Sequence, residues 1–185
     1  GYMAEKGRVV AITGTNGKTT TTTLVGEIMK AHLGEEKTFV VGNIGNPYTL
    51  EALKTAEDTV TVGELSSFQL ETVDTFLPQV FAILNVTPDH LNRHYTMEAY
   101  AGAKEKIAQN QTKEQICVLN YENEYTRAFG EKCSAKVIYF SSTRSLENGY
   151  FLQGEDICKA VSGQVEVLLN IHTGMNLVGL CNVEN

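Results

Sequence analysis

Residues 8–23 read RVVAITGTNGKTTTTT, an apolar run that leads through a glycine-containing turn into five threonines. The apolar, β-branched part, residues 8–13, predicts a buried strand that ends at Gly14. Apolar residues at helical spacing predict a helix over residues 18–33, although threonine is a poor helix former. We therefore expect contacts other than intrinsic propensity to hold the first turn of this helix.

The turn between this strand and this helix has the composition of a phosphate-binding loop. Its glycines allow several backbone amides to converge on one phosphate, and the helix N-terminus adds its positive end. Lys18 brings a positive charge to the outer phosphates, and Thr19 places a hydroxyl where a magnesium ligand is expected. The predicted nucleotide contacts are Gly14, Thr15, Asn16, Gly17, Lys18, Thr19 and Thr20.

The match to the general phosphate loop is incomplete. That eight-residue pattern has a glycine five positions before Gly17, where this chain has Ile12. An ordinary strand–turn–helix connection that happens to contain Gly-Lys-Thr is therefore the alternative interpretation. The flanking strand and helix favour the phosphate loop, because the chemistry requires this context.

Further along the chain, short β-branched runs alternate with helical segments. Strands are predicted at residues 37–41, 59–65, 80–84, 115–120 and 136–140, and helices at residues 47–53, 97–108 and 122–129. This alternation implies right-handed crossovers and an α/β fold, with a mainly parallel P-loop-type sheet and helices on both faces. Residues 149–170 contain short strands broken by glycines, which predict a small antiparallel appendage near the C-terminus. Residues 182–185 are expected to open a further helix.

The composition is that of an ordinary globular domain. The 185 residues fit one domain, with 42% hydrophobic and 20% charged residues. The net charge of −7 argues against a broad nucleic-acid surface, but it does not exclude a local nucleotide pocket. Residues 1–8 contain no apolar core of a signal peptide, so export is not expected, and no apolar run approaches the roughly 20 residues that a membrane helix needs. The four cysteines have no CxxC spacing, which is typical of free thiols in the reducing cytoplasm.

The shortened loop TGTNGKT, residues 13–19, resembles the phosphate loop of the Mur ligases and the related folylpolyglutamate synthases. Further strings that resemble the family follow in the expected order: GNIG at residues 42–45, ELSSFQLE at 64–71, NVTPDHL at 85–91, YAGAK at 100–104 and GLCNVEN at 179–185. The ELSSFQLE string is similar to the D-glutamate-adding branch of the family in particular. One departure is Cys181, which stands where the family usually has the histidine of its G-x-H-N motif.

By this resemblance, the expected activity is ATP-driven amide bond formation. A substrate carboxylate attacks the γ-phosphate of ATP to give an acyl phosphate, and the amine of an amino acid then displaces phosphate. The implied substrates are UDP-N-acetylmuramoyl-L-alanine and D-glutamate, the implied cofactors are ATP and magnesium, and no nucleic-acid or membrane partner is expected. Residues 1–185 are expected to form the single central domain of a cytoplasmic monomer, between a UDP-binding and an amino-acid-binding domain. Alone, this domain is expected to bind ATP weakly and not to ligate.

The resemblance implies a catalytic and metal-binding set of Thr19, Glu64, His90 and Lys104, with Lys18 neutralising the β- and γ-phosphates. Glu64 follows a predicted buried strand, where an unpaired acid would be costly, so a magnesium ligand is the favoured role. Pairing with a lysine or capping of a helix is the alternative for Glu64. His90 follows another predicted strand, and the family places a histidine there near the second metal; an exposed loop histidine is the alternative.

Lys104 looks, by pattern alone, like a surface lysine on a charged helix. In the family this lysine is carbamylated by carbon dioxide, which converts an ammonium into an oxygen ligand suited to a hard cation. The modification requires a neutral amine, and hence a lowered pKa near metals or other positive charge.

The resemblance also implies ligand contacts. Asn43 and His90 are expected at the muramoyl-alanine end of the substrate, and Ser66 near the same carboxylate or the metals. Asn185 falls where the family has its adenine-binding asparagine. The histidines expected to be structural are His32, His94 and His172.

Two alternatives remain at this point. One is a sister ligase or a folylpolyglutamate synthase, against which the ELSSFQ string argues. The other is a non-catalytic nucleotide-binding or regulatory module that keeps only the phosphate loop. The presence of Glu64, His90 and Lys104 together with the loop argues against that module.

Overall fold

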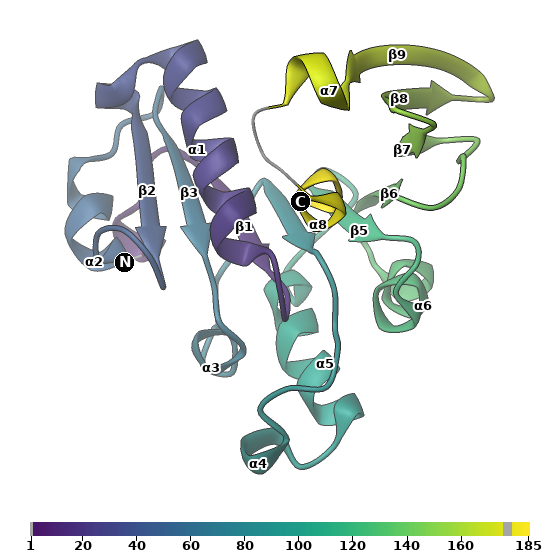
Figure 1. Cartoon of the computed structure of the whole chain (residues 1–185). Coiled ribbons are helices and arrows are strands. Elements are labelled where there is room, and N and C mark those ends of the chain that lie inside the picture. The colour runs from purple at the N-terminus through teal and green to yellow at the C-terminus, as the bar shows by residue number, and fades with distance from the viewer. Residues whose placement is uncertain (1, 176–178) are drawn as a thin grey trace.

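The structure, a computed structural model, describes residues 2–175 and 179–185 (Figure 1). These described residues form a nine-stranded sheet with the strand order β2-β3-β1-β4-β5-β6-β7-β8-β9. The strands are β1 (Arg8–Thr13), β2 (Thr38–Gly42), β3 (Val60–Glu64), β4 (Val80–Ile83), β5 (Ile116–Asn120), β6 (Lys136–Ser141), β7 (Gly149–Gln153), β8 (Asp156–Val161) and β9 (Gln164–Asn170).

The pairing of the strands changes along the sheet. Every neighbouring pair from β2 across to β7 is parallel, whereas β7, β8 and β9 form an antiparallel meander. Because β7 pairs with β6, the meander continues the main sheet at the edge opposite β2 (Figure 1). The predicted α/β fold with a mainly parallel sheet and an antiparallel appendage is confirmed.

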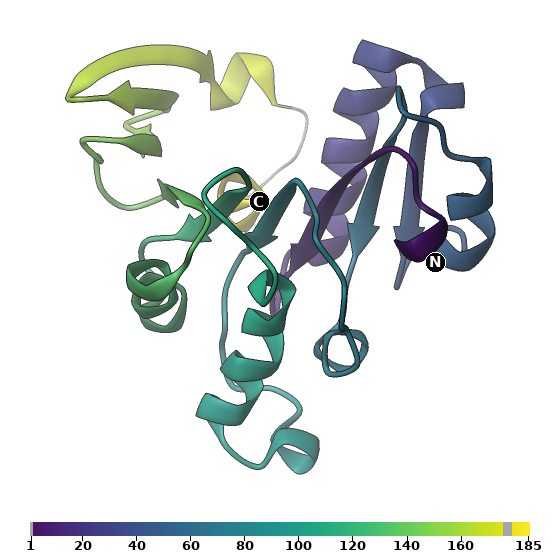
Figure 2. The same cartoon turned by 180° about the vertical axis from the view of Figure 1, so that it is seen from behind.

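Helices cover both faces of the sheet. The helices are α1 (Lys18–Leu33), α2 (Tyr48–Glu51), α3 (Ser67–Leu70), α4 (Leu91–His94), α5 (Met97–Glu105), α6 (Glu124–Lys132), α7 (Ile171–Gly174) and α8 (Leu180–Glu184), with 3-10 turns at Tyr2–Ala4, Glu35–Lys37, Ala52–Lys54 and Lys106–Ala108. Helix α1 lies on the face seen in Figure 1, whereas α5 and α6 lie on the face seen in Figure 2.

Two apolar clusters form the main core, one on each face. Val62 of β3 packs in a cluster with Val25 and Met29 of α1. Phe81 of β4 belongs to the larger cluster on the opposite face, together with Phe129 of α6. Burial on both faces explains why the central strands read as continuous apolar runs rather than as alternating patterns.

The differences from the predicted elements are small. The one-turn helices α3, α4 and α7 are not apparent in the sequence, because four residues are too few to show a helical period. A capping box between Ser66 and Gln69 stabilises α3 instead. Helix α6 starts later than predicted, because the Asn123 side chain accepts a hydrogen bond from the Thr126 amide and so fixes the first turn.

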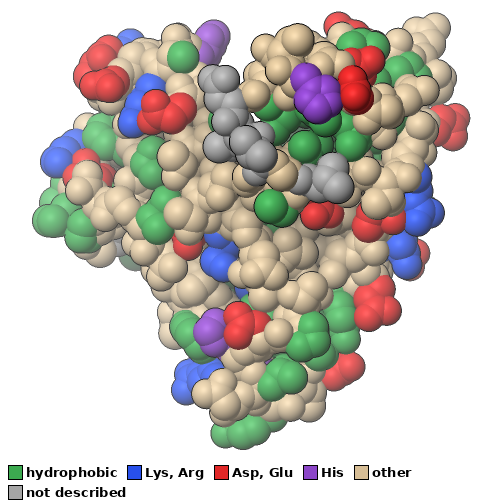
Figure 3. All heavy atoms as spheres, in the orientation of Figure 1, with side chains coloured by type: hydrophobic (Ala, Val, Ile, Leu, Met, Phe, Trp, Pro, Cys, Tyr) green, Lys and Arg blue, Asp and Glu red, His purple; other side chains and the backbone are tan. Residues whose placement is uncertain are grey.

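One face of the molecule carries charged side chains of both signs (Figure 3). On the face in Figure 3, acidic side chains are interspersed with those of lysine and arginine. Within residues 2–175 and 179–185, no helix has both the length and the apolar character to cross a bilayer.

Candidate active site

The candidate site lies at the carboxyl edge of the sheet, where β3, β1 and β4 end side by side. Parallel pairing aligns Ile12 with Glu64 and Thr13 with Ile83, so the segments that follow these strands leave the sheet together. Ligands of open α/β sheets collect at this edge. The phosphate loop, Glu64 and the segment that leads to His90 are therefore neighbours.

The start of α1 is shaped to receive an anion. Its N-cap residue is Gly17, whose left-handed backbone (φ 82°) is a conformation that favours glycine. Among the described residues, no side chain caps this helix start. An uncapped N-terminus presents backbone amides and a positive dipole end. Burial of Thr21 and Thr22 helps to hold the first turns, as the threonine run requires.

Asn85, just beyond the end of β4, holds the phosphate loop in place. Its side-chain oxygen accepts hydrogen bonds from the amides of Thr15 (3.0 Å) and Asn16 (2.8 Å), and its side-chain nitrogen donates to the Asn16 carbonyl (3.1 Å). The Thr15 amide also donates to the Asn85 carbonyl (2.9 Å). These two loop amides therefore hold the loop itself, which leaves the backbone amides at the uncapped start of α1 as the donors for a phosphate.

Glu64 is buried beside the helix start, with only 1% of its surface exposed. Its carboxylate accepts hydrogen bonds from the Thr19 hydroxyl (2.9 Å) and from the Asn43 side-chain amide (3.0 Å). Neither donor is a lysine or a backbone amide, so neither a lysine pair nor a helix cap accounts for this buried acid. Hydroxyl and carboxylate oxygens are ligands that magnesium prefers, and Thr19 and Glu64 already place two of them together. Within the described residues, no three His, Cys, Asp or Glu side chains are grouped so that they could hold a metal ion, either at this site or elsewhere.

Two lysines reach the carbonyls of the phosphate loop. Lys18 Nζ donates to the Thr15 carbonyl (2.9 Å), and Lys104 Nζ donates to the Gly14 carbonyl (2.8 Å). Lys104 is only 2% exposed, so the alternative of a surface lysine is wrong. The pKa of Lys104 is lowered to about 7, chiefly because burial disfavours its charged form and also because Lys18 lies nearby, while Asp89 opposes the shift. A substantial fraction of Lys104 is therefore a neutral amine near neutral pH.

His90 lies on the rim of the site as the N-cap of α4, with a left-handed backbone (φ 51°). Its ring centroid is 5.1 Å from that of Phe68 and 6.3 Å from that of Tyr100. The Tyr100 hydroxyl is 3.3 Å from Thr15 Oγ1, and Lys104 Nζ lies 4.5 Å from the centre of the Tyr100 ring. One buried tyrosine thus connects the imidazole, the lysine and the phosphate loop.

The two other residues predicted to contact the substrate follow neighbouring strands. Asn43 follows β2 directly and, as described above, donates to Glu64. Ser66 lies two residues after Glu64, where its hydroxyl donates to Gln69 Oε1 (2.9 Å) and accepts from the Gln69 amide (3.3 Å). The Ser66 side chain therefore caps α3. Through this cap it fixes the backbone that follows Glu64.

Asn185 returns to the phosphate loop from the far end of the chain. The Thr21 hydroxyl donates to the Asn185 carbonyl (3.4 Å). A Cβ atom built on Gly17 would overlap the side-chain oxygen of Asn185. The residue predicted to contact adenine therefore lies directly against the last glycine of the loop.

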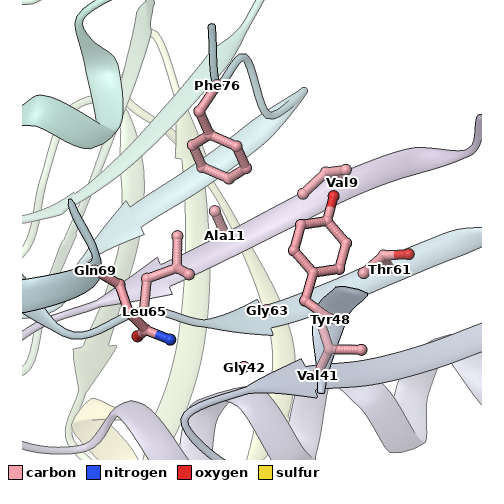
Figure 4. A pocket seen from close by; sticks show the side chains of 10 residues that line it. All are labelled: Val9, Ala11, Val41, Gly42, Tyr48, Thr61, Gly63, Leu65, Gln69 and Phe76. Atoms are coloured by element: carbon pink, nitrogen blue, oxygen red, sulfur yellow. The ribbon is translucent and has the colours of Figure 1, made fainter. Parts of the chain in front are cut away.

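Two hollows lie away from the phosphate loop. A cavity of 60 Å³ lies on the face of β1, β2 and β3 that points away from α1 (Figure 4). Tyr48, Leu65 and Phe76 separate it from a more open groove of 310 Å³, which they also line. Neither hollow includes a predicted site residue, so both are distinct from the phosphate loop.

Sequence reasoning missed two residues that contact the phosphate loop, Asn85 and Tyr100. Asn85 and Tyr100 belong to the strings that mark the family, but their contacts with the loop span 70 and 85 residues and cannot be read from local pattern. His94 was expected to be structural. It is buried, and its ring packs against both Phe68 and Tyr100, the two side chains that also contact His90.

Comparison with known proteins extends over nearly the whole chain. The family model described as the Mur ligase middle domain matches residues 12–185. The UDP-N-acetylmuramoylalanine–D-glutamate ligases of Lachnospira eligens and Clostridioides difficile are 58% and 50% identical to it, over 100% and 95% of this chain. The matched region is 40% and 38% of these relatives, so the chain spans about two fifths of their length.

Solved structures share the fold. A UDP-N-acetylmuramoyl-L-alanyl-D-glutamate–2,6-diaminopimelate ligase superposes with a TM-score of 0.74 at 23% identity, over 97% of this chain and 41% of that one. The MurF ligase of Thermotoga maritima, solved in complex with ADP, gives a TM-score of 0.58 at 18% identity, over 89% of this chain and 40% of that one. At such identities the likeness shows a common fold, whereas the family assignment depends on the family model and the curated relatives. The chain belongs to the Mur ligase middle domain family.

Proposed function

We propose that this chain forms the ATP-binding core of a ligase that joins D-glutamate to UDP-N-acetylmuramoyl-L-alanine in the synthesis of peptidoglycan precursors. One observation carries the proposal: the buried Glu64 carboxylate lies beside the Thr19 hydroxyl at an uncapped helix start, with Lys18 and Lys104 on adjacent loop carbonyls. The relatives that are 58% and 50% identical bear the name of this ligase, which supports the choice of substrates. The ELSSFQLE string supports the same branch.

In the proposed reaction, the start of α1 binds the β- and γ-phosphates of ATP through its backbone amides. Phosphoryl transfer depends mainly on positioning and on neutralising charge, so a cation at this point is needed. Lys18 supplies it by exchanging its present contact with the Thr15 carbonyl for the phosphate oxygens. Gly17, Thr19 and Thr20 contribute amides, and Asn185 closes over the loop on the adenosine side.

Thr19 and Glu64 would hold a magnesium ion, because they offer a hydroxyl and a carboxylate oxygen within 2.9 Å of each other. Such an ion supplies charge neutralisation for the phosphates when it is bound. Asn43 occupies the other carboxylate oxygen of Glu64 and so fixes the orientation of the acid. We place His90 and Lys104 around a second ion or the acyl substrate.

The proposed chemical steps are those that the resemblance to the family implies. A carboxylate oxygen of UDP-N-acetylmuramoyl-L-alanine attacks the γ-phosphorus as the bond to ADP breaks, which gives an acyl phosphate. The amine of D-glutamate then attacks the acyl carbon, phosphate leaves, and the nitrogen loses a proton. Asn43, Ser66 and His90 are proposed to position the acyl end. The uridine and amino-acid subsites are proposed to lie in domains before and after residues 1–185.

We propose that Lys104 carries a carbamate in the working enzyme. Its neutral amine attacks carbon dioxide and loses a proton, which leaves an N-carboxylate in place of an ammonium. Burial at 2% exposure and a pKa lowered to about 7 support this step, since the neutral amine is the reactive form. With ¹³C-bicarbonate, NMR of the wild type should show a carbamate signal that disappears in Lys104→Gln; its persistence in the variant would assign the signal to another amine.

The function is tested by phosphate release from a full-length protein that contains this chain. With ATP, magnesium and UDP-N-acetylmuramoyl-L-alanine, we expect release to depend on D-glutamate. Activity with L-lysine, diaminopimelate or tetrahydrofolate, and none with D-glutamate, would overturn the assignment. Undiminished turnover in a Lys104→Ala variant would instead support the non-catalytic module as the role of this domain.

A further inference from the structure

Helix α4 is a single turn with unusual backbone at both ends. Three described residues other than glycine have positive φ, and two of them, His90 (φ 51°) and Tyr95 (φ 67°), flank this helix. One helical turn is not stable by itself in water. A left-handed conformation in a residue with a side chain persists only when surrounding contacts determine it. Something must therefore hold α4, and with it the backbone of His90.

The side chain of His94, the last residue of α4, is the anchor. It is 6% exposed, and both of its ring nitrogens have partners in the segment after β3. Nε2 lies 3.0 Å from the Ser67 hydroxyl, and Nδ1 lies 3.4 Å from a carboxylate oxygen of Glu71. The other oxygen of Glu71 accepts a hydrogen bond from Arg93 (2.9 Å), so two consecutive residues of the α4 turn are tied to one acid.

The faces of the His94 ring are also fixed. Phe68 stacks on it with an interplanar angle of 6° and a centroid distance of 5.7 Å, and Tyr100 packs against it at 5.1 Å. These two aromatic rings are also the ones that contact His90. Within α4, the His94 amide donates to the His90 carbonyl at 3.0 Å. The anchor and the rim imidazole are thus linked through backbone and through shared packing.

Ser67, His94 and Glu71 are the side-chain types of a hydrolytic triad, but their burial excludes that chemistry. Ser67 is only 2% exposed, so its hydroxyl has no route to a substrate. A nucleophile must reach the reacting carbon. The cluster therefore acts on the structure of the site and not on a bond of the substrate.

We propose that His94 is a positioning residue that holds His90 in its left-handed backbone and aims its imidazole at the acyl substrate. The Ser67 and Glu71 contacts fix His94 to the segment that carries Glu64. The distance between the metal-binding carboxylate and the rim imidazole is thereby set by a buried side chain. This inference rests on the proposed function, in which His90 contacts UDP-N-acetylmuramoyl-L-alanine.

The test measures substrate binding by calorimetry in the full-length protein. We expect His94→Ala to weaken binding of UDP-N-acetylmuramoyl-L-alanine about tenfold, because a displaced His90 loses its contact. Binding of a non-hydrolysable ATP analogue should change by less than about twofold, since the phosphate loop is held separately by Asn85. His94→Gln should restore part of the affinity, because its amide can still meet Ser67. In a His90→Ala background, His94→Ala should add less than about twofold, because both changes remove one contact.

Controls separate positioning from general damage. His172→Ala is the matched control, since His172 also pairs with a glutamate (3.2 Å from Glu155) but lies in α7, and it should leave both affinities unchanged. If melting curves show that His94→Ala is unfolded at the assay temperature, the milder variant Ser67→Ala replaces it in the test. We expect Ser67→Ala to weaken binding of UDP-N-acetylmuramoyl-L-alanine by about threefold. Equal weakening of acyl and ATP-analogue binding, or full weakening in the His90→Ala background, would overturn the inference. If the wild type ligates D-glutamate while His94→Ala and Ser67→Ala bind the acyl substrate normally, this inference is wrong and the proposed function stands. If the wild type binds no UDP-muramoyl substrate, the proposed function is wrong.

Discussion

The carboxyl ends of β1 and β3 belong to the same sheet as the meander β7–β9. The two regions nevertheless differ in which side chains they bury: ionisable side chains are buried in the first, and apolar side chains are exposed in the second. At the first end, Glu64 and Lys104 are almost completely buried. In the meander, Val165 and Val167 are 52% and 60% exposed. Burying ionisable groups is costly, whereas exposing single apolar side chains costs little. We infer that the carboxyl ends of β1 and β3 carry a cost in stability that the meander does not.

The largest expected effect comes from Glu64→Gln. This change keeps the size of the side chain and removes its charge, so the proposed magnesium site loses its anionic ligand. We expect kcat for phosphate release in the full-length enzyme to fall about 100- to 1,000-fold. The matched change in the meander, Glu166→Gln, removes an exposed charge and should leave kcat within about twofold. A comparable fall in kcat in both variants would show that the two regions do not differ in their contribution to phosphate release.

Lys104→Met tests the cost of burying an ionisable group through the free energy of unfolding. The folded-state pKa of Lys104 is lowered to about 7 from an ordinary value of 10.5, so the unfolded chain binds more protons between these pH values. The cost of burying the ammonium is therefore complete below pH 7 and disappears as pH rises through this window. We expect Lys104→Met to be more stable than the wild type by about 2 kcal/mol at pH 6, with the gain shrinking towards pH 10.

Urea denaturation at a series of pH values measures this difference. The exposed Lys113→Met serves as the control and should change the free energy of unfolding by less than about 0.5 kcal/mol. A Lys104→Met variant that loses stability at pH 6 would show that the hydrogen bond to the Gly14 carbonyl outweighs the burial of charge.

Gly17→Ala and Gly163→Ala place a side chain on the same left-handed backbone conformation, once in each region. Both glycines have positive φ, 82° and 77°, but a Cβ at Gly17 would meet Asn185, whereas nothing lies near Gly163. We expect about 1 kcal/mol of destabilisation at Gly163 from backbone strain alone, and about 2 kcal/mol at Gly17. Binding of an ATP analogue should weaken about tenfold in Gly17→Ala only. Equal melting temperatures for the two variants would mean that the Asn185 side chain moves away from the new methyl group without destabilising the fold.

The smallest effect is expected from asparagine changes. Asn85→Ala removes the side-chain hydrogen bonds to the phosphate loop but leaves the bond from the Thr15 amide to the carbonyl of residue 85, and we expect about fivefold weaker binding of the ATP analogue. Asn148→Ala is its counterpart in the meander, where Asn148 accepts one hydrogen bond from the Ser162 amide (2.8 Å). That change should lower stability by about 1 kcal/mol and leave nucleotide binding unaltered. Weaker binding in Asn148→Ala would show that the meander contributes to the nucleotide site.

The sequence predicts the fold well because the central strands are buried on both faces. Runs such as residues 8–13 and 80–84 are then apolar throughout and end at polar or glycine-containing segments. Single-turn helices escape this reasoning, since four residues show no period. For the same reason nothing in the pattern places α4, on which the geometry of His90 depends.

The candidate site was less predictable than the fold. Short strings identify Lys18, Thr19 and Glu64 because the chemistry fixes their spacing or their place at a strand end. By contrast, Lys104 reads as a surface lysine until its helix is packed against the loop. Asn85 acts through contacts that span 70 residues and depend on which strands are neighbours. The roles assigned to these residues in ligation stay predictions, to be decided by the experiments above.

The contact between Thr21 and Asn185 joins segments 164 residues apart. During synthesis, the phosphate loop leaves the ribosome before the nine-stranded sheet is complete, whereas the residue that covers Gly17 emerges only after all nine strands. A nascent chain that ends within β9 therefore has a loop without its cover. A chain truncated within β9 should therefore bind an ATP analogue more weakly than a chain that extends to Asn185.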